Sequence, residues 1–93
     1  MVTAIILMNV KRDRINEVAE ELAELSGVSE VYSVAGRYDL AVIVRVRVNE
    51  ELAELVTEKI RAVEDITYTE TMIAFRAYSR HDLEGMFSIG LEG

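Results

Sequence analysis

The spacing of apolar residues divides the chain into strand-like and helix-like segments. Short runs rich in β-branched residues, either uninterrupted or with a period of two, predict strands over residues 2–8, 28–35, 40–48 and 66–78. Two segments between them carry apolar residues at helical spacing with carboxylates in the intervening positions. These segments predict amphipathic helices over residues 15–25 and 52–63.

The order of these segments is β-α-β-β-α-β, and the second half echoes the first. A duplicated βαβ unit with right-handed crossovers forms one sheet with its helices on the same side. The sequence therefore predicts a single α+β domain of ferredoxin-like fold, in which a four-stranded antiparallel sheet carries two helices on one face.

Local signals refine this picture. Asp13 and Asn49 precede the two helices and are expected to cap them, and Gly27 suits the position of positive φ after the first helix. In the second strand, the two-residue period predicts Val28 and Tyr32 on one face and Val31 on the other.

The sheet has an apolar surplus on the face that the helices leave uncovered. Ile5 and Leu7 lie opposite the other apolar residues of the first strand, and Ala41 and Ile43 lie opposite the valines of the third. A monomer would expose a contiguous apolar patch of this kind to solvent, so we expect a homodimer through the sheet faces, a dimeric α+β barrel. The segment 80–93 is also rich in apolar residues, and we expect it to pack on the domain or on a neighbouring subunit.

Composition narrows the possible functions. The 93 residues include no Cys and one His, which argues against disulfides, iron–sulfur clusters and thiolate or His-rich metal sites. We expect no bound cofactor. The net charge of −7 makes direct nucleic-acid binding unfavourable, because an acidic surface repels phosphate. The longest apolar run, residues 4–8, is too short to cross a membrane. We therefore expect a cytoplasmic protein.

Candidate catalytic residues are few. Ser79, His81 and Asp82 are near one another in sequence, but a catalytic triad needs groups that the fold brings together from separate backbone positions. The acidic residues are spread along the helices, without the spacing of a calcium loop, and the glycines are too scattered to form a phosphate-binding loop. We therefore expect neither catalytic nor metal-ligating residues.

Two features allow a binding function. The segment Gly36-Arg37-Tyr38-Asp39 is compatible with a simple hairpin turn, but its backbone N–H groups could also bind a carboxylate, and Asp39 an ammonium group. Thr67, Thr69 and Thr71 alternate along the last strand. Their β-propensity alone explains them, although their hydroxyl groups could also contact a ligand.

Taken together, these segments resemble the effector-binding domain of the Lrp/AsnC family, also called the RAM domain. The resemblance rests on the element order, on the segment 28–40 with its Gly-x-Tyr-Asp sequence, and on Thr69 and Thr71 in the last strand, and it covers residues 1–79. It implies dimers that assemble into larger rings, commonly octamers, and a bound amino acid or similar effector near the contacts between dimers. By correspondence, Gly36, Tyr38, Asp39, Thr69 and Thr71 are the expected ligand-binding residues.

The chain departs from the full-length regulators of that family in one respect. Those regulators begin with a helix-turn-helix domain, whereas the first residues here already predict a strand. The resemblance therefore implies a stand-alone sensor module that regulates amino-acid metabolism without binding DNA, with a DNA-binding Lrp/AsnC relative as a partner.

Two other functions share the predicted fold. Small cofactor-free monooxygenases and isomerases use the dimeric α+β barrel as well, and fold does not determine function. Such an enzyme needs an internal cavity with an ionisable group, whereas the predicted inner positions are aliphatic. A structural assembly subunit, which would bind no ligand, is the third interpretation.

Overall fold

A computed structural model describes residues 1–78 and 80 of the chain. It confirms the predicted β-α-β-β-α-β order. The elements are β1 (Val2–Val10), the 3₁₀ turn η1 (Arg12–Arg14), α1 (Ile15–Ala23), β2 (Val28–Ser33), β3 (Leu40–Val46), α2 (Asn49–Glu54), its π-helical continuation η2 (Leu55–Ile60) and β4 (Ile66–Ile73).

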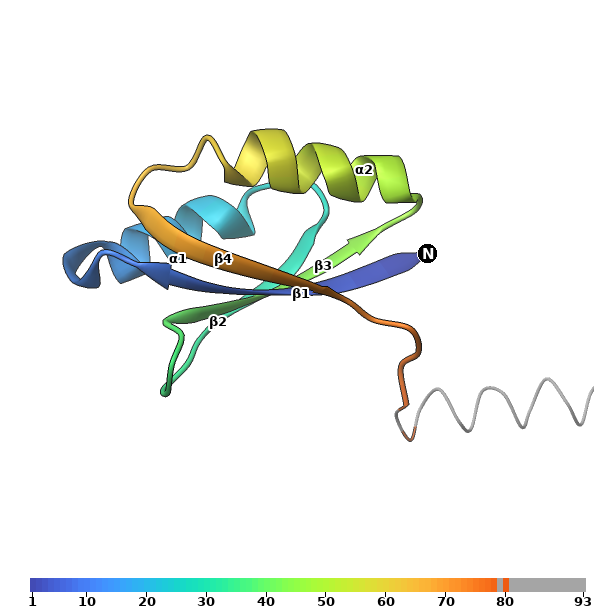
Figure 1. Cartoon of the computed structure of the whole chain (residues 1–93), viewed down its shortest axis with the longest axis horizontal. Helices are drawn as coiled ribbons and strands as arrows, with labels where there is room; N and C mark the ends of the chain where they lie inside the picture. The colour runs from blue at the N-terminus through green and yellow to red at the C-terminus, as the bar shows by residue number, and fades with distance from the viewer. Residues whose placement is uncertain (79, 81–93) are drawn as a thin grey trace, which may run out of the picture.

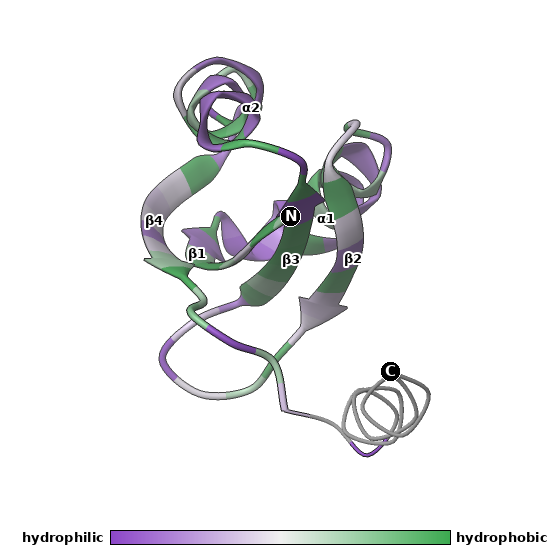
Figure 2. Cartoon of the chain, turned by 90° about the vertical axis from the view of Figure 1, so that its right-hand side faces the viewer, coloured by the Kyte–Doolittle hydropathy of each residue, from purple (hydrophilic) through white to green (hydrophobic). Residues whose placement is uncertain are grey.

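The four strands form one antiparallel sheet in the order β2-β3-β1-β4. Both helices lie on the same side of it, as Figures 1 and 2 show, so the ferredoxin-like fold and its helix layer are confirmed. The strands β1 and β3 occupy the centre, and β2 and β4 form the two edges. On the opposite side of the sheet, called the open face below, none of the helices in the described part of the chain packs.

The core lies between the helices and the sheet. Alternate residues of β1 and β3 point into it and meet the apolar stripes of the helices. Its buried residues are Ala4, Ile6, Met8, Val10, Val18, Leu22, Leu40, Val42, Val44, Val46, Leu52, Leu55, Ile60 and Val63. Fully burying one such large aliphatic side chain contributes about 1.5–3 kcal/mol, so this layer supplies most of the driving force for folding. Within the described residues, no polar side chain is buried.

Strand β2 differs from its expected pattern. Val28 pairs with Val44 of β3, but Glu30 pairs with Ile43, so the register shifts between them. The extra residue puts Val28 and Val31 on the same side, where both pack against the core. The prediction that they lie on opposite faces was therefore wrong, because a two-residue period cannot reveal a bulge.

The helix ends also differ from expectation. The first residue of α1 is Ile15 and Arg14 precedes it as N-cap, while Asn49 is already inside α2. Neither helix has a side-chain cap, so the predicted capping by Asp13 and Asn49 was wrong. Gly27, in contrast, has the predicted positive φ of 97°.

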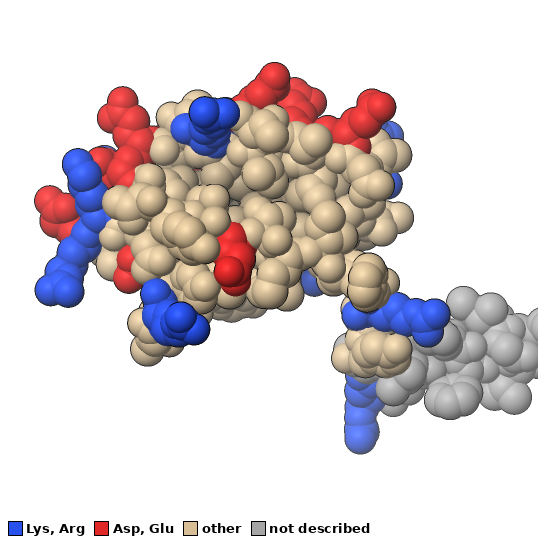
Figure 3. Space-filling model, viewed as in Figure 1, with Lys and Arg blue, Asp and Glu red and all other residues tan. Residues whose placement is uncertain are grey.

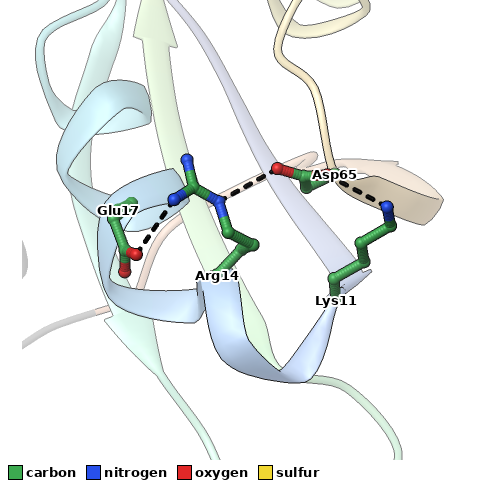
Figure 4. Close-up of polar contacts among 4 residues, drawn as sticks. All are labelled: Lys11, Arg14, Glu17 and Asp65. Carbon is green, nitrogen blue, oxygen red and sulfur yellow. Dashed lines mark hydrogen bonds and ion pairs between the residues drawn. The ribbon is translucent and has the colours of Figure 1, made fainter.

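Asp65 connects the turn between β1 and α1 to the start of β4. Asp65 lies just before β4, and its carboxylate contacts Lys11 Nζ at 3.4 Å and Arg14 Nε at 3.0 Å (Figure 4). Its carbonyl oxygen accepts a hydrogen bond from the Lys11 N–H. Arg14 also pairs with Glu17 of α1. Asp65 thereby ties the end of β1 and the start of α1 to the start of β4.

The last strand is shorter than predicted, since β4 ends at Ile73 and an irregular segment follows to Tyr78. Of the segment 80–93, only Arg80 is among the described residues. The expectation that this segment packs on the domain or a neighbour therefore lies outside them, as does the one for Ser79, His81 and Asp82.

Candidate ligand-binding site

The loop between β2 and β3 folds back on itself and on the end of β1. The Val34 N–H donates to the Asp39 carbonyl at 3.0 Å, and the Asp39 N–H donates to the Met8 carbonyl at 2.9 Å. The Asp39 carboxylate accepts a further bond, 2.9 Å long, from the N–H of Val10. Asp39 is half-buried, and one of its carboxylate oxygens already accepts a hydrogen bond from the backbone of β1, a long-range contact that sequence reasoning did not identify.

Tyr38 extends from this loop to the edge strand β4. Its ring stacks on that of Tyr68, with centroids 6.4 Å apart and an interplanar angle of 18°. Its hydroxyl group donates to Glu70 at 3.3 Å. Desolvation raises the pKa of the Tyr38 phenol above its ordinary value, and the nearby negative charge and hydrogen bond of Glu70 raise it further. Tyr38 therefore holds the loop against β4 in its neutral form.

Gly36 lies at the exposed tip of the loop. Its φ of 128° is a conformation that other residues rarely adopt, and a Cβ there would meet no other atom within 4 Å. Glycine is therefore needed for backbone conformation and not for close packing. Beside it, the side-chain amide of Asn9 donates to the Arg37 carbonyl at 2.9 Å. The tip is thereby held in place while its surface stays open to solvent.

The expected threonines lie on the other side of β4. Thr69 and Thr71 pair with Met8 and Ile6, whose side chains point into the core. Because side chains alternate along a strand, both hydroxyl groups lie on the helix side of the sheet, opposite to Tyr68. The structure thus brings Tyr38 to β4 but separates it from the threonines by the thickness of the sheet. The five predicted residues do not form one compact cluster within a subunit.

The backbone of the threonines is directed toward the free edge of the sheet. The N–H of Ala74 donates to the Thr3 carbonyl of β1. In an antiparallel pair, only alternate residues point their N–H and C=O groups at the partner strand. The backbone groups of Thr69 and Thr71 therefore point away from β1. They are available to a ligand or to another chain.

A concave surface, called the α2–β4 groove below, lies between the second helix and β4. It has a volume of about 530 Å³. Its lining residues are Val56, Thr57, Ile60, Arg61, Val63, Ile66, Thr67, Tyr68 and Thr69. Sequence reasoning singled out only Thr67 and Thr69 of these residues and missed the groove itself, because its helical wall includes the π-helical turn η2, which apolar spacing does not reveal.

The open face has an apolar centre and a polar rim. Ile5 pairs with Ile43 on one side and with Met72 on the other, so the three form a row across the sheet. On β2 and β3, Arg45 pairs with Glu30, which also accepts a hydrogen bond from Tyr32. The apolar residues expected on this face do lie there. Figure 3 shows the charged side chains gathered mainly over the helix layer and around the rim of the molecule.

Comparison with known proteins gives a consistent result. The family model of the Lrp/AsnC ligand-binding domain matches residues 3–83. A crystal structure from Thermus thermophilus is 46% identical, with a TM-score of 0.80, and the match covers 86% of this chain and 100% of that one. The structure of AsnC from Escherichia coli is 25% identical, with a TM-score of 0.77, and the match covers 84% of this chain and 53% of AsnC.

The curated relatives are longer proteins. An uncharacterised HTH-type transcriptional regulator of Pyrococcus furiosus is 42% identical over 59 residues, which are 63% of this chain and 39% of the regulator. The HTH-type regulator FL11 of the same organism is 32% identical over 77 residues, 83% of this chain and 50% of FL11. The chain thus spans half or less of the length of these relatives. Among the described residues, no helix is long and apolar enough to cross a membrane.

Proposed function

Since the chain belongs to the Lrp/AsnC ligand-binding domain family, we propose that it is an oligomeric sensor of an amino acid or a similar small effector. Its homologues are transcriptional regulators, so the response is the control of genes of amino-acid metabolism. In this proposal the domain itself does not contact DNA, and a DNA-binding relative carries that task. The net charge of −7 favours this division of roles.

The observation that carries the proposal is the loop of Gly36, Tyr38 and Asp39. Three backbone contacts and the Tyr38–Tyr68 stack hold this loop rigid, yet Gly36 at its tip stays exposed. A preorganised, accessible loop loses little conformational entropy when a ligand binds. In the proposed site, N–H groups at the tip bind the effector carboxylate.

The threonines complete the proposed site from another copy of the chain. Thr69 and Thr71 face away from Tyr38 within a subunit, while their backbone groups point to a free sheet edge. An effector that contacts both the loop and the threonines therefore lies between subunits. We propose a homodimer through the open face, on which no helix of the described residues covers the row of Ile5, Ile43 and Met72, and a larger ring of such dimers.

The enzyme alternative has less support. An enzyme of the dimeric α+β barrel type needs an ionisable group within an internal cavity. The helix-facing core of the described residues holds aliphatic side chains and no buried polar one. Nothing in this part of the molecule therefore favours a catalytic role over a sensory one.

A panel of amino acids tests the proposal. Each is added at millimolar concentration, and the unfolding midpoint and the mass in solution are measured. An effector at about 100 times its Kd should add roughly 2.7 kcal/mol to the free energy of unfolding. Thr71→Val should weaken this effect by removing a hydroxyl at constant shape, while Ser26→Ala, in the turn before β2 at the other edge, should not. The proposal would be contradicted if no amino acid of the panel raised the unfolding midpoint. It would also be contradicted if an amino acid raised it equally in the wild type, in Thr71→Val and in the loop variant Gly36→Ala.

A further inference from the structure

We infer that the α2–β4 groove is a ligand site in its own right, which binds a small monocarboxylate with a branched aliphatic chain. Figure 1 shows α2 lying above β4, and the groove runs between them. Gly36, Tyr38 and Asp39 are not among its lining residues. The groove shares Thr69 with the proposed effector site, but its cation and its aliphatic floor come from residues outside that site, so Arg61 and Val56 variants test it separately from the loop.

The size of the groove suits a small molecule. Its volume of about 530 Å³ falls within the range of roughly 300–1,000 Å³ that is typical of ligand pockets. Two local irregularities border it. One is the π-helical turn η2, and the other is the register shift where Val10 pairs with Ile66 but Asn9 pairs with Tyr68, which leaves Thr67 without a partner on β1. Both kinds of irregularity occur often at functional sites, because they open space that regular elements would fill.

The floor of the groove is aliphatic. Ile60 and Val63 belong to the buried core, and Val56 and Ile66 pack against it while remaining partly exposed. A ligand that covers Val56 and Ile66 removes apolar surface from water, which favours the complex and offsets part of the cost of association. The shape of these β-branched side chains favours a branched aliphatic chain over a charged or planar one.

The charge of the groove selects the head group. Arg61 makes none of the ion pairs or side-chain hydrogen bonds found among the described residues, and it is one of the residues that line the groove. None of the described lining residues is acidic, although the chain has 17 Asp and Glu residues. In Figure 3 the surface between α2 and β4 is correspondingly poor in red side chains. Arginine binds carboxylates in bidentate fashion, and the hydroxyl groups of Thr67 and Thr69 can donate to the same anion.

The absence of an acid in that lining has a second consequence. An α-ammonium group bound there would find no carboxylate partner, so it would be desolvated without compensation. The groove should therefore bind a carboxylic acid or a 2-oxo acid at least as well as the amino acid of the same carbon skeleton. This preference distinguishes the groove from a site built for amino acids.

Four ligands with one carbon skeleton test the inference. Isocaproate, α-ketoisocaproate, leucine and isocaproamide are titrated into the full-length chain while its amide NMR signals are followed. We expect the two acids without an ammonium group to shift signals of Val56, Arg61 and Thr69, and isocaproamide, which lacks the charge, to bind roughly tenfold more weakly or worse. Equal binding of the amide and the acid, or shifts confined to the loop 34–39, would overturn the inference.

Two variants locate the charge and the cavity. Arg61→Gln should weaken isocaproate binding by about tenfold or more, whereas Arg12→Gln, an equal charge change at another exposed arginine, should leave it unchanged. Val56→Trp should block the groove from within, and its NMR spectrum shows whether the fold is kept. If Arg61→Gln binds isocaproate as the wild type does, or if leucine alone among the four ligands binds, the inference is wrong.

Discussion

The carboxylate of Asp39 should contribute to stability as well as to any ligand site. Its Oδ2 accepts a 2.9 Å hydrogen bond from the N–H of Val10, a residue that is only 6% exposed. The substitution Asp39→Ala removes this acceptor and leaves the N–H without a partner. Asp39→Asn keeps a carbonyl oxygen in the same place but removes the charge. The two variants therefore separate the loss of an acceptor from the loss of a charge.

The expected magnitude follows from the burial of the pair. A hydrogen bond to a charged group contributes about 1.5–3 kcal/mol, and a donor left unpaired costs a similar amount. Asp39 is only half-buried, so solvent compensates part of the loss, and we expect Asp39→Ala to lower the free energy of unfolding by about 1–2 kcal/mol. For a domain of this size that corresponds to a fall in Tm of roughly 4–8 °C per kcal/mol. Asp39→Asn should lose less than half as much.

Urea denaturation followed by circular dichroism measures both variants against the wild type. Glu20→Ala, the truncation of an exposed acid on α1, serves as the control and should change stability little. The anchoring role of Asp39 is refuted if Asp39→Ala unfolds within about 0.5 kcal/mol of the wild type. It is also refuted if Asp39→Asn is as unstable as Asp39→Ala, because then the charge and not the acceptor matters.

Three further predictions address other parts of the molecule. Asp65 has a φ of 74°, which Asn tolerates and Ala does not, and its ion pairs reach partly exposed partners. In urea denaturation, Asp65→Asn should therefore lower the free energy of unfolding by up to about 1 kcal/mol, and Asp65→Ala should lower it by about 1–2 kcal/mol more. A loss for Asp65→Asn that exceeds the additional loss for Asp65→Ala would contradict this. The raised pKa of the Tyr38 phenol means that the folded state keeps its proton where the unfolded chain loses it, so this contribution to stability is present below pH 10.0 and declines above it. The pKa of the Tyr32 phenol is also raised, by its hydrogen bond to Glu30 and the charge of that residue, so ultraviolet titration should show two tyrosines ionising late in the wild type, and only one in Tyr38→Phe. Ile43→Asp puts a charge in the centre of the open face, where a dimer would bury it without a partner, so light scattering should show a smaller mass than for the wild type. An unchanged mass with unchanged stability would argue against a dimer through that face.

The periodicity of the sequence was sufficient to predict the sheet and its helix layer. The alternation in β1 and β3 assigned the buried and open faces correctly, because both strands are regular and central. It failed at β2, where a bulge near Ser29 moved Val31 to the core side. It also extended β4 beyond Ile73, since apolar alternation continues to Ala77 although pairing with β1 stops earlier.

The candidate site was predictable in its residues but not in its geometry. The resemblance drew attention to Tyr38 and Asp39, and the structure places both in one anchored loop. It could not show that one carboxylate oxygen of Asp39 already accepts a hydrogen bond from the Val10 N–H, since that bond joins positions 29 apart in the chain. Nor could it show on which side of β4 each side chain lies, because that depends on the register shift opposite Asn9 and Val10.

In the proposed site, the separation of Tyr38 from Thr69 and Thr71 would link ligand binding to assembly. If one effector contacts both sides of β4, its two groups of contacts come from different subunits, and the complete site exists only in the assembled protein. Thermodynamic linkage then requires that the effector strengthen the subunit contact by the same factor by which assembly strengthens effector binding. Analytical ultracentrifugation with and without the effector gives the first factor, and titration at low and high protein concentration gives the second. Two unequal factors would mean that assembly and binding involve further coupled states, and a factor of one in both would place the whole site within a single subunit.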